Sequence, residues 1–307
     1  MKRSAPITAA AVLAISLLTA CGSTPSTTAD AAAAAAPIEW AGLADAPACE
    51  ALREKHPDLV GQTLTNALNP HTPGYETINP SNPNEYEGFD IDLGNAIGSC
   101  LGFTVDYVPV GFAELIPTVT SGRADWIISN LYATEERAKG GVDFVSYAKV
   151  FDGILVKTGN PKGLTGIDTS LCGSTVALNK GYVEVPLVEG VASECEAKGL
   201  PAATVSLFDS SADSVQAVLS GRADAYMNDV NTVLGFIAQH PEKLASAETV
   251  MLDYEIGIGI PQGQHGLREA VVGALTEIQG QGIQQKLAAR WELSQSEDAQ
   301  PTVLSAN

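Results

Sequence analysis

The chain has 307 residues, of which 36 are acidic and 17 basic, and its formal net charge at pH 7 is −19. This acidic balance argues against nucleic-acid partners and against electrostatic adsorption to an anionic membrane, although acidity alone names no ligand. About 260 residues follow the N-terminal segments described next, enough for one large core or two smaller ones.

The first residues have the pattern of an export signal. Lys2 and Arg3 precede a mostly apolar run from Ile7 to Leu18, too short for a permanent membrane span. The tetrapeptide that ends at Cys21 resembles a bacterial lipobox, whose cysteine is lipidated and becomes the mature N-terminus; a plain secretory signal is the alternative. We expect a signal peptide at residues 1–20 and a lipoprotein on the outer face of the cell membrane.

The segment after the expected lipid anchor lacks the apolar pattern of a packed core. Residues 22–37 are Ser, Thr, Ala and Pro with one charge, a composition typical of a tether. We therefore assign residues 21–44 to a flexible, lipid-anchored tether. The lipid is the only membrane contact that we expect.

Apolar periodicity and turn residues predict helices that alternate with strands. Residues 69–87, rich in Pro, Asn and Gly, are predicted to form an irregular loop that carries ligand contacts. Asp45 and Thr134 are predicted helix N-caps. An α/β fold follows from the alternation. Strands are predicted at 59–68, 103–110, 126–128, 153–157, 171–178, 205–208, 224–227 and 255–260, and helices at 45–56, around 91–101, at 112–121, from 134, after 182, around 214–219 and within 267–291.

The pentapeptide Ser-Gly-Arg-Ala-Asp occurs twice, at residues 121–125 and 220–224. Each copy closes an amphipathic helix, turns at a glycine and opens an apolar run short enough for a buried strand. Polar residues follow at the same offset, Ser-Asn at 129–130 and Asn-Asp at 228–229. Because ligands lie beyond the carboxyl ends of strands in open α/β sheets, the repeat predicts two related lobes that hold a ligand between them. A coincidence of helix-stop residues is the alternative.

Four cysteines remain besides the expected lipidation site. An even number in an exported chain favours disulfides, and three pairings are possible. Cys172 and Cys195 lie within one expected lobe, and Cys49 and Cys100 belong to the other, so we favour the pairs Cys49–Cys100 and Cys172–Cys195. A buried free thiol at Cys100 is the alternative. No spacing of Cys and His suggests zinc, and we expect no cofactor.

Several motifs occur in a consistent order across residues 60 to 293. They are Gly-Phe-Asp-Ile-Asp-Leu at 88–93, Leu-Ile-Pro at 115–117, the two pentapeptides, Thr-Glu-Glu-Arg-Ala at 134–138, Asp-Phe at 143–144 and the C-terminal segment 282–291. Together they resemble the family 3 solute-binding proteins, the extracytoplasmic receptors of amino-acid ABC importers. Leu-Cys-Gly-Ser-Thr-Val at 171–176 resembles the lipoprotein branch of Gram-positive bacteria.

The resemblance implies the type II periplasmic-binding-protein fold, in which two α/β lobes are joined by two crossover strands. It places lobe 1 at residues 45–151 and 254–293, lobe 2 at 152–253, and a C-terminal tail at 294–307. It also implies a monomer without enzymatic activity that hands an amino acid or a related amine to the permease subunits of an ABC transporter.

Site residues follow from the resemblance one at a time. Arg137 matches the arginine that holds the ligand α-carboxylate, for which a planar guanidinium gives a bidentate grip; an ordinary exposed helix arginine is the alternative. Asp229 matches the acid that holds the α-ammonium. Ser129 and Asn130 match residues that bind the amino-acid head group. Phe112 matches an aromatic that stacks on the ligand, with a core phenylalanine as the alternative.

Two positions depart from the family pattern. Gly-Tyr-Val at 181–183 replaces the usual Gly-Ser/Thr-Thr, so the Gly181 N–H remains but the threonine hydroxyl does not. Tyr132 stands where a small or hydroxyl residue is common. Tyr132, Tyr182 and Phe112 would then wall the pocket with aromatic rings, which would suit a betaine or other quaternary amine through cation–π contact, or an aromatic side chain.

Two further classes of protein compete with a plain receptor. The same fold occurs in exported cyclohexadienyl dehydratases, and fold does not determine function. Such chemistry needs a positioned acid or base, for which Glu184 is the candidate, but Arg137 and Asp229 together suit an amino-acid zwitterion better. A sensory ligand-binding module is the other class; the sequence shows no membrane span or kinase-like segment after the binding region.

Overall fold

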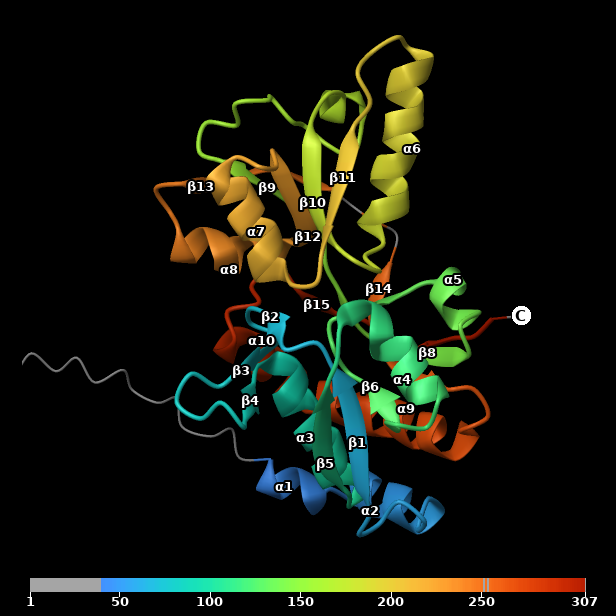
Figure 1. Cartoon of the computed structure of the whole chain (residues 1–307). Coiled ribbons are helices and arrows are strands. Elements are labelled where there is room, and N and C mark those ends of the chain that lie inside the picture. Colours follow the sequence, from blue (N-terminus) through green and yellow to red (C-terminus); the bar gives the residue numbers. More distant parts are fainter. Residues whose placement is uncertain (1–39, 251, 253, 307) are drawn as a thin grey trace, which may run out of the picture. The chain divides into compact units, whose positions relative to one another are not determined.

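A computed structural model describes residues 40–250, 252 and 254–306 (Figure 1). The expected signal peptide, the expected lipidation site Cys21 and most of the expected tether lie outside these residues. The described chain forms two large sheets, each with its own hydrophobic core, and helices alternate with their strands. This arrangement confirms the predicted α/β class. No helix among the described residues is both long and apolar enough to cross a membrane.

The first sheet has eight strands and mixed directions. Its order is β15-β8-β14-β6-β1-β5, with β16 paired to β8 and β7 paired to β14. β1 runs parallel to β5 and β6, and β14 runs antiparallel to β6, β7 and β8. The strands are β1 (Thr63–Leu68), β5 (Thr104–Pro109), β6 (Trp126–Ile127), β7 (Tyr132–Ala133), β8 (Val142–Lys149), β14 (Glu255–Pro261), β15 (Glu297–Asp298) and β16 (Val303–Leu304).

Helices cover both faces of the first sheet. Successive strand residues point to opposite faces, so Trp126 packs in the cluster with α3 and α9, while Ile127 packs with α4 and α5. The first face is covered by α1 (Ala41–Ala44), α2 (Pro47–Lys55), α3 (Phe89–Leu101), α9 (His265–Gly280) and α10 (Ile283–Arg290), and the second by the 3₁₀ turn η1 (Phe112–Glu114), α4 (Leu115–Thr120) and α5 (Glu135–Ala138).

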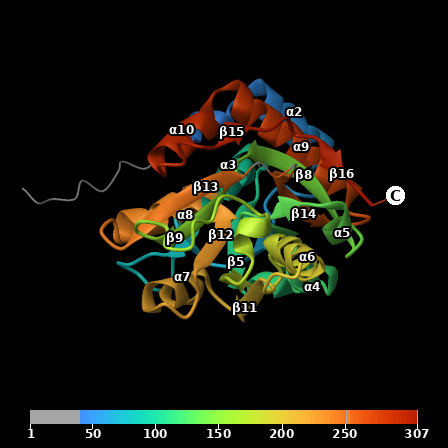
Figure 2. The same cartoon turned by 90° about the horizontal axis from the view of Figure 1, so that it is seen from above.

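The second sheet has five strands in the order β11-β10-β12-β9-β13. β10 runs parallel to β11 and β12, whereas β9 runs antiparallel to β12 and β13. Figures 1 and 2 show α6 on one side of this sheet and α7 and α8 on the other. The elements are β9 (Asp152–Lys157), η2 (Thr169–Leu171), β10 (Thr175–Asn179), α6 (Glu184–Ala197), β11 (Thr204–Phe208), α7 (Ser211–Ser220), β12 (Ala225–Asp229), α8 (Val230–Gln239) and β13 (Leu244–Val250).

The repeated pentapeptide has the same structural role in each sheet. The Asp125 carboxylate accepts a hydrogen bond from the Thr65 N–H at 2.7 Å, and the Asp125 N–H donates to the Thr65 carbonyl at 2.8 Å. Asp224 makes the same two bonds with Thr175, at 2.8 and 2.7 Å. Each aspartate therefore fixes the start of its strand against the parallel neighbour, β1 or β10. The pentapeptide is scaffold, as the equivalence of its two flanks predicts.

Two predicted boundaries at the ends of the chain are wrong. Residues 41–44, expected in the tether, form α1, and Leu43 is buried in the core of the first sheet. Residues 294–307, expected as a tail, contribute β15 and β16, which pair with β8. Both segments therefore belong to the packed part of the chain.

Local predictions also need correction in several places. The expected irregular loop at 69–87 contains a small sheet of β2 (His71–Thr72), β3 (Glu76–Ile78) and β4 (Tyr86–Glu87). The strand expected at 171–178 begins only at Thr175, because η2 precedes it. Asp45 is not the cap of α2, whose N-cap is Ala46 with Pro47 in the first turn. β8, β13 and α8 were not predicted.

Both favoured disulfides are present. Cys49–Cys100 joins α2 to α3, and Cys172–Cys195 joins the turn before β10 to α6. Cys100 is therefore not a free thiol.

Position 88, the N-cap of α3, requires glycine because it has no room for a side chain. Its φ is +138°, and an added Cβ would lie 2.1 Å from the Tyr75 carbonyl oxygen. We expect Gly88→Ala to lower the free energy of unfolding by about 2–4 kcal/mol, measured by urea denaturation. The control is Gly190→Ala in α6, where an added Cβ meets nothing within 4 Å. It should be neutral or stabilising by up to about 1 kcal/mol. Equal stability of the two variants would contradict this account of Gly88.

Candidate functional site

The candidate site lies where β6 and β12 end. Asn130 follows β6, Asp229 ends β12, and the two residues are 99 positions apart, the same offset as the two pentapeptides. Asn130 Nδ2 donates to Asp229 Oδ2 at 2.8 Å. The two sequence-predicted residues are therefore brought together, one from each sheet.

Asp229 is a fully buried helix cap. Its Oδ1 accepts from the N–H groups of Asn231 and Thr232 at 3.0 and 3.1 Å, which caps α8. The Thr232 hydroxyl and Asn130 Nδ2 donate to Oδ2. Burial raises the pKa of Asp229, and these donors oppose the rise because they stabilise the carboxylate. Asp229 is thus a buried carboxyl group that four donors hold in place on the second sheet, where it contacts Asn130 of the first.

Asn130 has an unusual backbone. Its φ of +42° lies in the left-handed region, which few residues other than glycine adopt. Its N–H donates to Asp90 Oδ2 at 2.6 Å, and its side-chain Oδ1 is buried without a hydrogen-bond partner among the described residues. Strained residues of this kind persist where the surrounding structure holds them, often at functional sites.

A buried pair of carboxyl groups, Glu76 and Asp90, supports the end of β6. Ser129 Oγ donates to Glu76 Oε1 at 3.2 Å, and the Tyr147 hydroxyl donates to Asp90 Oδ1 at 2.8 Å. Burial raises the pKa of Asp90 to about 6, and burial together with Asp90 raises the pKa of Glu76 well above its usual value. The two groups therefore retain a proton under conditions in which exposed carboxyl groups have lost theirs.

Ser129 lies beneath the site. Its Oγ accepts from the Asn69 N–H at 2.8 Å while it donates to Glu76. These two bonds make Ser129 part of the support for Asn130. Sequence reasoning missed Glu76 and found Asp90 only as a member of the 88–93 motif.

Arg137 connects the two halves of the site. Thr134 caps α5, as predicted, by accepting from the Arg137 N–H at 3.1 Å. The guanidinium donates through Nη1 to the Tyr132 carbonyl and through Nη2 to the Gly181 carbonyl, both at 2.8 Å. Burial lowers the pKa of Arg137 to about 10, so the group stays charged at neutral pH. A half-buried arginine with these partners is not an ordinary exposed helix arginine.

Phe112 and Tyr182 face each other across the site. Their ring centroids are 4.8 Å apart with an interplanar angle of 79°, an edge-to-face contact. The Arg137 guanidinium lies 5.4 Å from the centroid of the Phe112 ring, so this ring already has a cation as its neighbour. Phe112 packs against the cores of both sheets.

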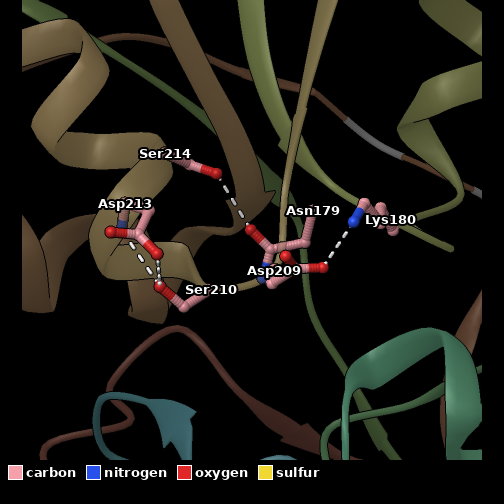
Figure 3. Close-up of polar contacts among 6 residues, drawn as sticks. All are labelled: Asn179, Lys180, Asp209, Ser210, Asp213 and Ser214. Atoms are coloured by element: carbon pink, nitrogen blue, oxygen red, sulfur yellow. Dashed lines mark hydrogen bonds and ion pairs between the residues drawn. The ribbon is translucent and has the colours of Figure 1, made fainter.

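The Tyr182 hydroxyl is anchored within the second sheet. It accepts from Asn179 Nδ2 and Asn228 Nδ2, each at 3.1 Å, and lies 3.0 Å from Ser211 Oγ. Asn179 is itself held by Ser214, whose Oγ donates to Asn179 Oδ1 at 2.9 Å (Figure 3). The turn that carries Gly181 and Tyr182 is thereby fixed to α7. Figure 3 also shows the Lys180–Asp209 ion pair and the Ser210–Asp213 bonds that cap this helix.

Tyr132 contacts other residues than the Phe112–Tyr182 pair does. Its ring packs near Tyr254, with centroids 6.2 Å apart, and its hydroxyl donates to Asp152 Oδ1 at 2.9 Å. The structure therefore brings Phe112 and Tyr182 together but does not place Tyr132 in the same aromatic pair.

A second buried pair of carboxyl groups, Asp152 and Glu184, lies at the site. Each side chain belongs to a residue that is 1% exposed. Burial and the neighbouring Glu184 raise the pKa of Asp152 well above its usual value, and burial raises the pKa of Glu184 to about 6. No sequence pattern singles out Asp152, which is close to Glu184 only in the folded chain. The described residues contain no cluster of His, Cys, Asp and Glu that could hold a metal ion.

The fold is that of the two-lobed amino-acid-binding proteins. A model of the bacterial extracellular solute-binding proteins, family 3, matches residues 64–294. The chain belongs to this family, as the sequence motifs indicated. The family is extracytoplasmic and binds amino acids for ABC transport.

Individual relatives share less than a third of their residues with this chain. A probable histidine-binding protein of Campylobacter jejuni is 29% identical over 170 residues, which are 55% of this chain and 62% of that protein. The arginine-binding protein ArgT of Corynebacterium glutamicum is 24% identical over 263 residues, 84% of each chain.

Solved structures of related proteins have the same fold. An ancestral arginine-binding protein bound to arginine has a TM-score of 0.68 and 28% identity, over 75% of this chain and 97% of that one. An ancestral amino-acid-binding protein, described as a precursor of cyclohexadienyl dehydratase, has a TM-score of 0.62 and 26% identity, over 78% of this chain and 99% of that one.

The Glu76–Asp90 pair generates a prediction about stability. Asp90→Asn replaces one acceptor oxygen by an amide donor, so it cannot accept from both the Asn130 N–H and the Tyr147 hydroxyl. We expect a loss of about 1–3 kcal/mol in the free energy of unfolding at pH 7. The control is Asp106→Asn, an exposed position that should change stability by less than about 0.5 kcal/mol. An unchanged urea midpoint for Asp90→Asn would show that these two bonds contribute nothing.

The raised carboxyl pKa values also predict how stability depends on pH. Between their unfolded and folded pKa values, these groups bind more protons in the folded chain than in the unfolded one. Their contribution is therefore complete below about pH 4, and the part that Asp90 and Glu184 supply is lost as the pH rises through about 6. We expect the free energy of unfolding to fall between pH 4.5 and pH 6.5, with a smaller slope in Asp90→Asn. Rising stability over this interval would contradict the assignment.

Proposed function

We propose that this protein is a receptor that captures an amino acid between its two lobes. The observation that carries the proposal is the pairing of Arg137 and Asp229 with groups of the opposite lobe. Arg137 contacts the Gly181 carbonyl, and Asp229 contacts the Asn130 amide. A cation on one lobe and an anion on the other match the carboxylate and ammonium of an amino-acid zwitterion.

Binding exchanges weak contacts between the lobes for stronger ones to the ligand. The α-carboxylate takes the place of the neutral Gly181 carbonyl on the Arg137 guanidinium and gains charge-assisted bonds. The α-ammonium takes the place of the Asn130 amide on Asp229. It also supplies a donor to Asn130 Oδ1, which is otherwise unpartnered in the described chain.

The remaining predicted residues take supporting roles in this proposal. The Gly181 N–H is a second donor to the carboxylate, and the Phe112 and Tyr182 rings flank the bound head group. Ser129 holds the Asn130 backbone in place through Glu76. Tyr132 presents its carbonyl to Arg137 and its hydroxyl to Asp152.

The domain organisation and cellular location are part of the proposal. Lobe 1 comprises residues 45–151 and 254–293, extended by α1 and by the C-terminal strands, and lobe 2 comprises 152–253. This division is supported by the second sheet, whose strands all lie between Asp152 and Val250. A signal peptide at 1–20 directs export and is removed, and the lipid on Cys21 and a tether then hold a monomer at the outer face of the membrane, where it delivers ligand to the permease of an ABC transporter.

An exported dehydratase is the second candidate. Glu184 favours it, because a buried carboxyl group whose pKa is raised to about 6 can act as a general acid. The ancestral protein described as a dehydratase precursor has the same fold, but its description is that of an amino-acid-binding protein. Formation of product from arogenate or prephenate would establish the enzyme. If no product forms while at least one standard amino acid binds, the receptor is favoured.

A thermal-shift screen tests the receptor proposal. A ligand that binds only the native state stabilises it and so raises the melting temperature. At a ligand concentration of one hundred times Kd, the added stability is about 2.7 kcal/mol. We expect at least one standard amino acid to raise it and Arg137→Ala to abolish the shift. The control Arg222→Ala removes an exposed arginine of the second pentapeptide and should keep the shift.

Two results of the screen would contradict the proposal. If no standard amino acid shifts the melting temperature of the wild type, the protein is not an amino-acid receptor. Binding of a betaine in preference to every standard amino acid would instead favour the quaternary-amine alternative.

A further inference from the structure

Asp152 and Glu184 face each other although they come from different elements. Asp152 is the first residue of β9, at the point where the chain enters the second sheet, and Glu184 is the first residue of α6. Both residues are 1% exposed, and their side chains are within hydrogen-bonding reach of each other. Two buried carboxyl groups that lie within hydrogen-bonding reach of each other cannot both be ionised without a large cost in free energy.

The hydrogen-bond partners of this pair are incomplete. Asp152 Oδ1 accepts from the Tyr132 hydroxyl, but in the part of the chain that the structure describes no donor from any other residue reaches Asp152 Oδ2 or Glu184 Oε1, which leaves a proton shared between the two carboxyl groups to satisfy them. Arg137 is the cation that acts on Glu184, yet its guanidinium donates to the carbonyls of Tyr132 and Gly181. Within the same described residues, Arg137 and Glu184 form no ion pair. The pair is therefore not simply the counter-ion of Arg137.

The charges at the site do not balance for a neutral amino acid. Asp152, Glu184 and Asp229 are three buried acids, and Arg137 is the one cation that acts on the Asp152–Glu184 pair. An amino-acid zwitterion adds one positive and one negative charge, which satisfy Asp229 and Arg137. The Asp152–Glu184 pair then still needs a positive charge, which a shared proton or a cationic ligand group can supply.

We propose that Asp152 and Glu184 form a subsite for a cationic ligand side chain, a guanidinium or an alkylammonium, which displaces the proton that the two carboxyl groups share. The inference rests on the proposed function and narrows its substrate class to basic amino acids. No bond is made or broken other than that of the proton, which passes to the solvent buffer.

The neighbours of the pair leave it as the group that titrates. Facing it are Tyr132 from β7, Arg137 from α5, Tyr182 from the turn before α6 and Asp229 from β12. Burial raises the pKa of both tyrosines further above 10, and Arg137 remains charged below a pKa of about 10. Four donors to Asp229 stabilise its carboxylate and oppose the rise in its pKa that burial causes. Asp90 of the Glu76–Asp90 pair can also exchange a proton between pH 5 and pH 7, but arginine and citrulline present the same head group to it, so a difference between them in proton release is assigned to the Asp152–Glu184 pair.

L-Arginine and L-citrulline provide a matched pair of probes. They have nearly the same shape, but the ureido group of citrulline is neutral. Titration calorimetry at pH 6 in two buffers of different ionisation enthalpy measures both affinity and proton release. We expect arginine to release close to one proton and citrulline close to none. We expect arginine to bind about 30-fold more tightly or better at pH 7.5, because citrulline leaves the buried carboxylates unpaired.

The affinity for arginine should also depend on pH with a defined sign. Because one proton is released, binding strengthens as the pH rises, by up to about tenfold per pH unit below the pKa of the pair. Citrulline binding should show no such dependence over the same interval.

Variants of the pair separate this subsite from the rest of the site. Glu184→Gln should lose proton release and bring the ratio of arginine to citrulline affinity close to one, and Asp152→Asn should do the same. Glu189→Gln is the control, because Glu189 is exposed on the same helix α6. It should behave as the wild type does.

Three outcomes would overturn the inference. If arginine and citrulline bind equally, without proton release, the pair is only a structural contact and the receptor proposal stands. If arginine fails to bind but a neutral amino acid binds in an Arg137-dependent way, the subsite is wrong and the receptor proposal again stands. If no amino acid binds, both fall.

Discussion

The hydrogen bond between Asn130 and Asp229 connects the two sheets at the point where their equivalent strands end. Both residues are held by rigid neighbours: Asp229 caps α8, and the backbone of Asn130 is bound by Asp90. A bond to a buried carboxylate contributes about 1.5–3 kcal/mol, comparable to the cost of keeping Asn130 in a left-handed conformation. A ligand ammonium that replaces the amide therefore acts on two lobes that are already positioned for it.

Buried carboxyl pairs flank this bond on both lobes, and they have different roles. Both oxygens of Asp90 and Oε1 of Glu76 accept from protein donors, and this pair supports Asn130 from below, although Glu76 Oε2 has no partner among the described residues. Asp152 and Glu184 have oxygens without donors and lie beside Arg137. The same physical device, a proton retained by burial, thus stabilises the scaffold in one lobe and leaves a place for a cation in the other.

Much of the scaffold could be predicted from the sequence, because its signals are local. The pentapeptide marks β6 and β12, glycines follow the preceding helices, and the polar residues at the same offset after each pentapeptide include Asn130 and Asp229. The short strands β2, β3, β4, β15 and β16 could not be predicted, since a segment of two or three residues has no periodicity of its own and becomes a strand only by pairing with another segment. The Asp152–Glu184 pair was missed for the same reason: burial brings the two residues together, and neither has a distinctive local pattern.

A crystal structure of the protein grown with L-arginine at pH 7.5 tests the central claim most directly. The account predicts the arginine carboxylate on the Arg137 guanidinium and its α-ammonium on Asp229. It also predicts that the Asn130 amide no longer donates to Asp229. A bound amino acid elsewhere on the chain, with the bond between Asn130 and Asp229 intact, would contradict it.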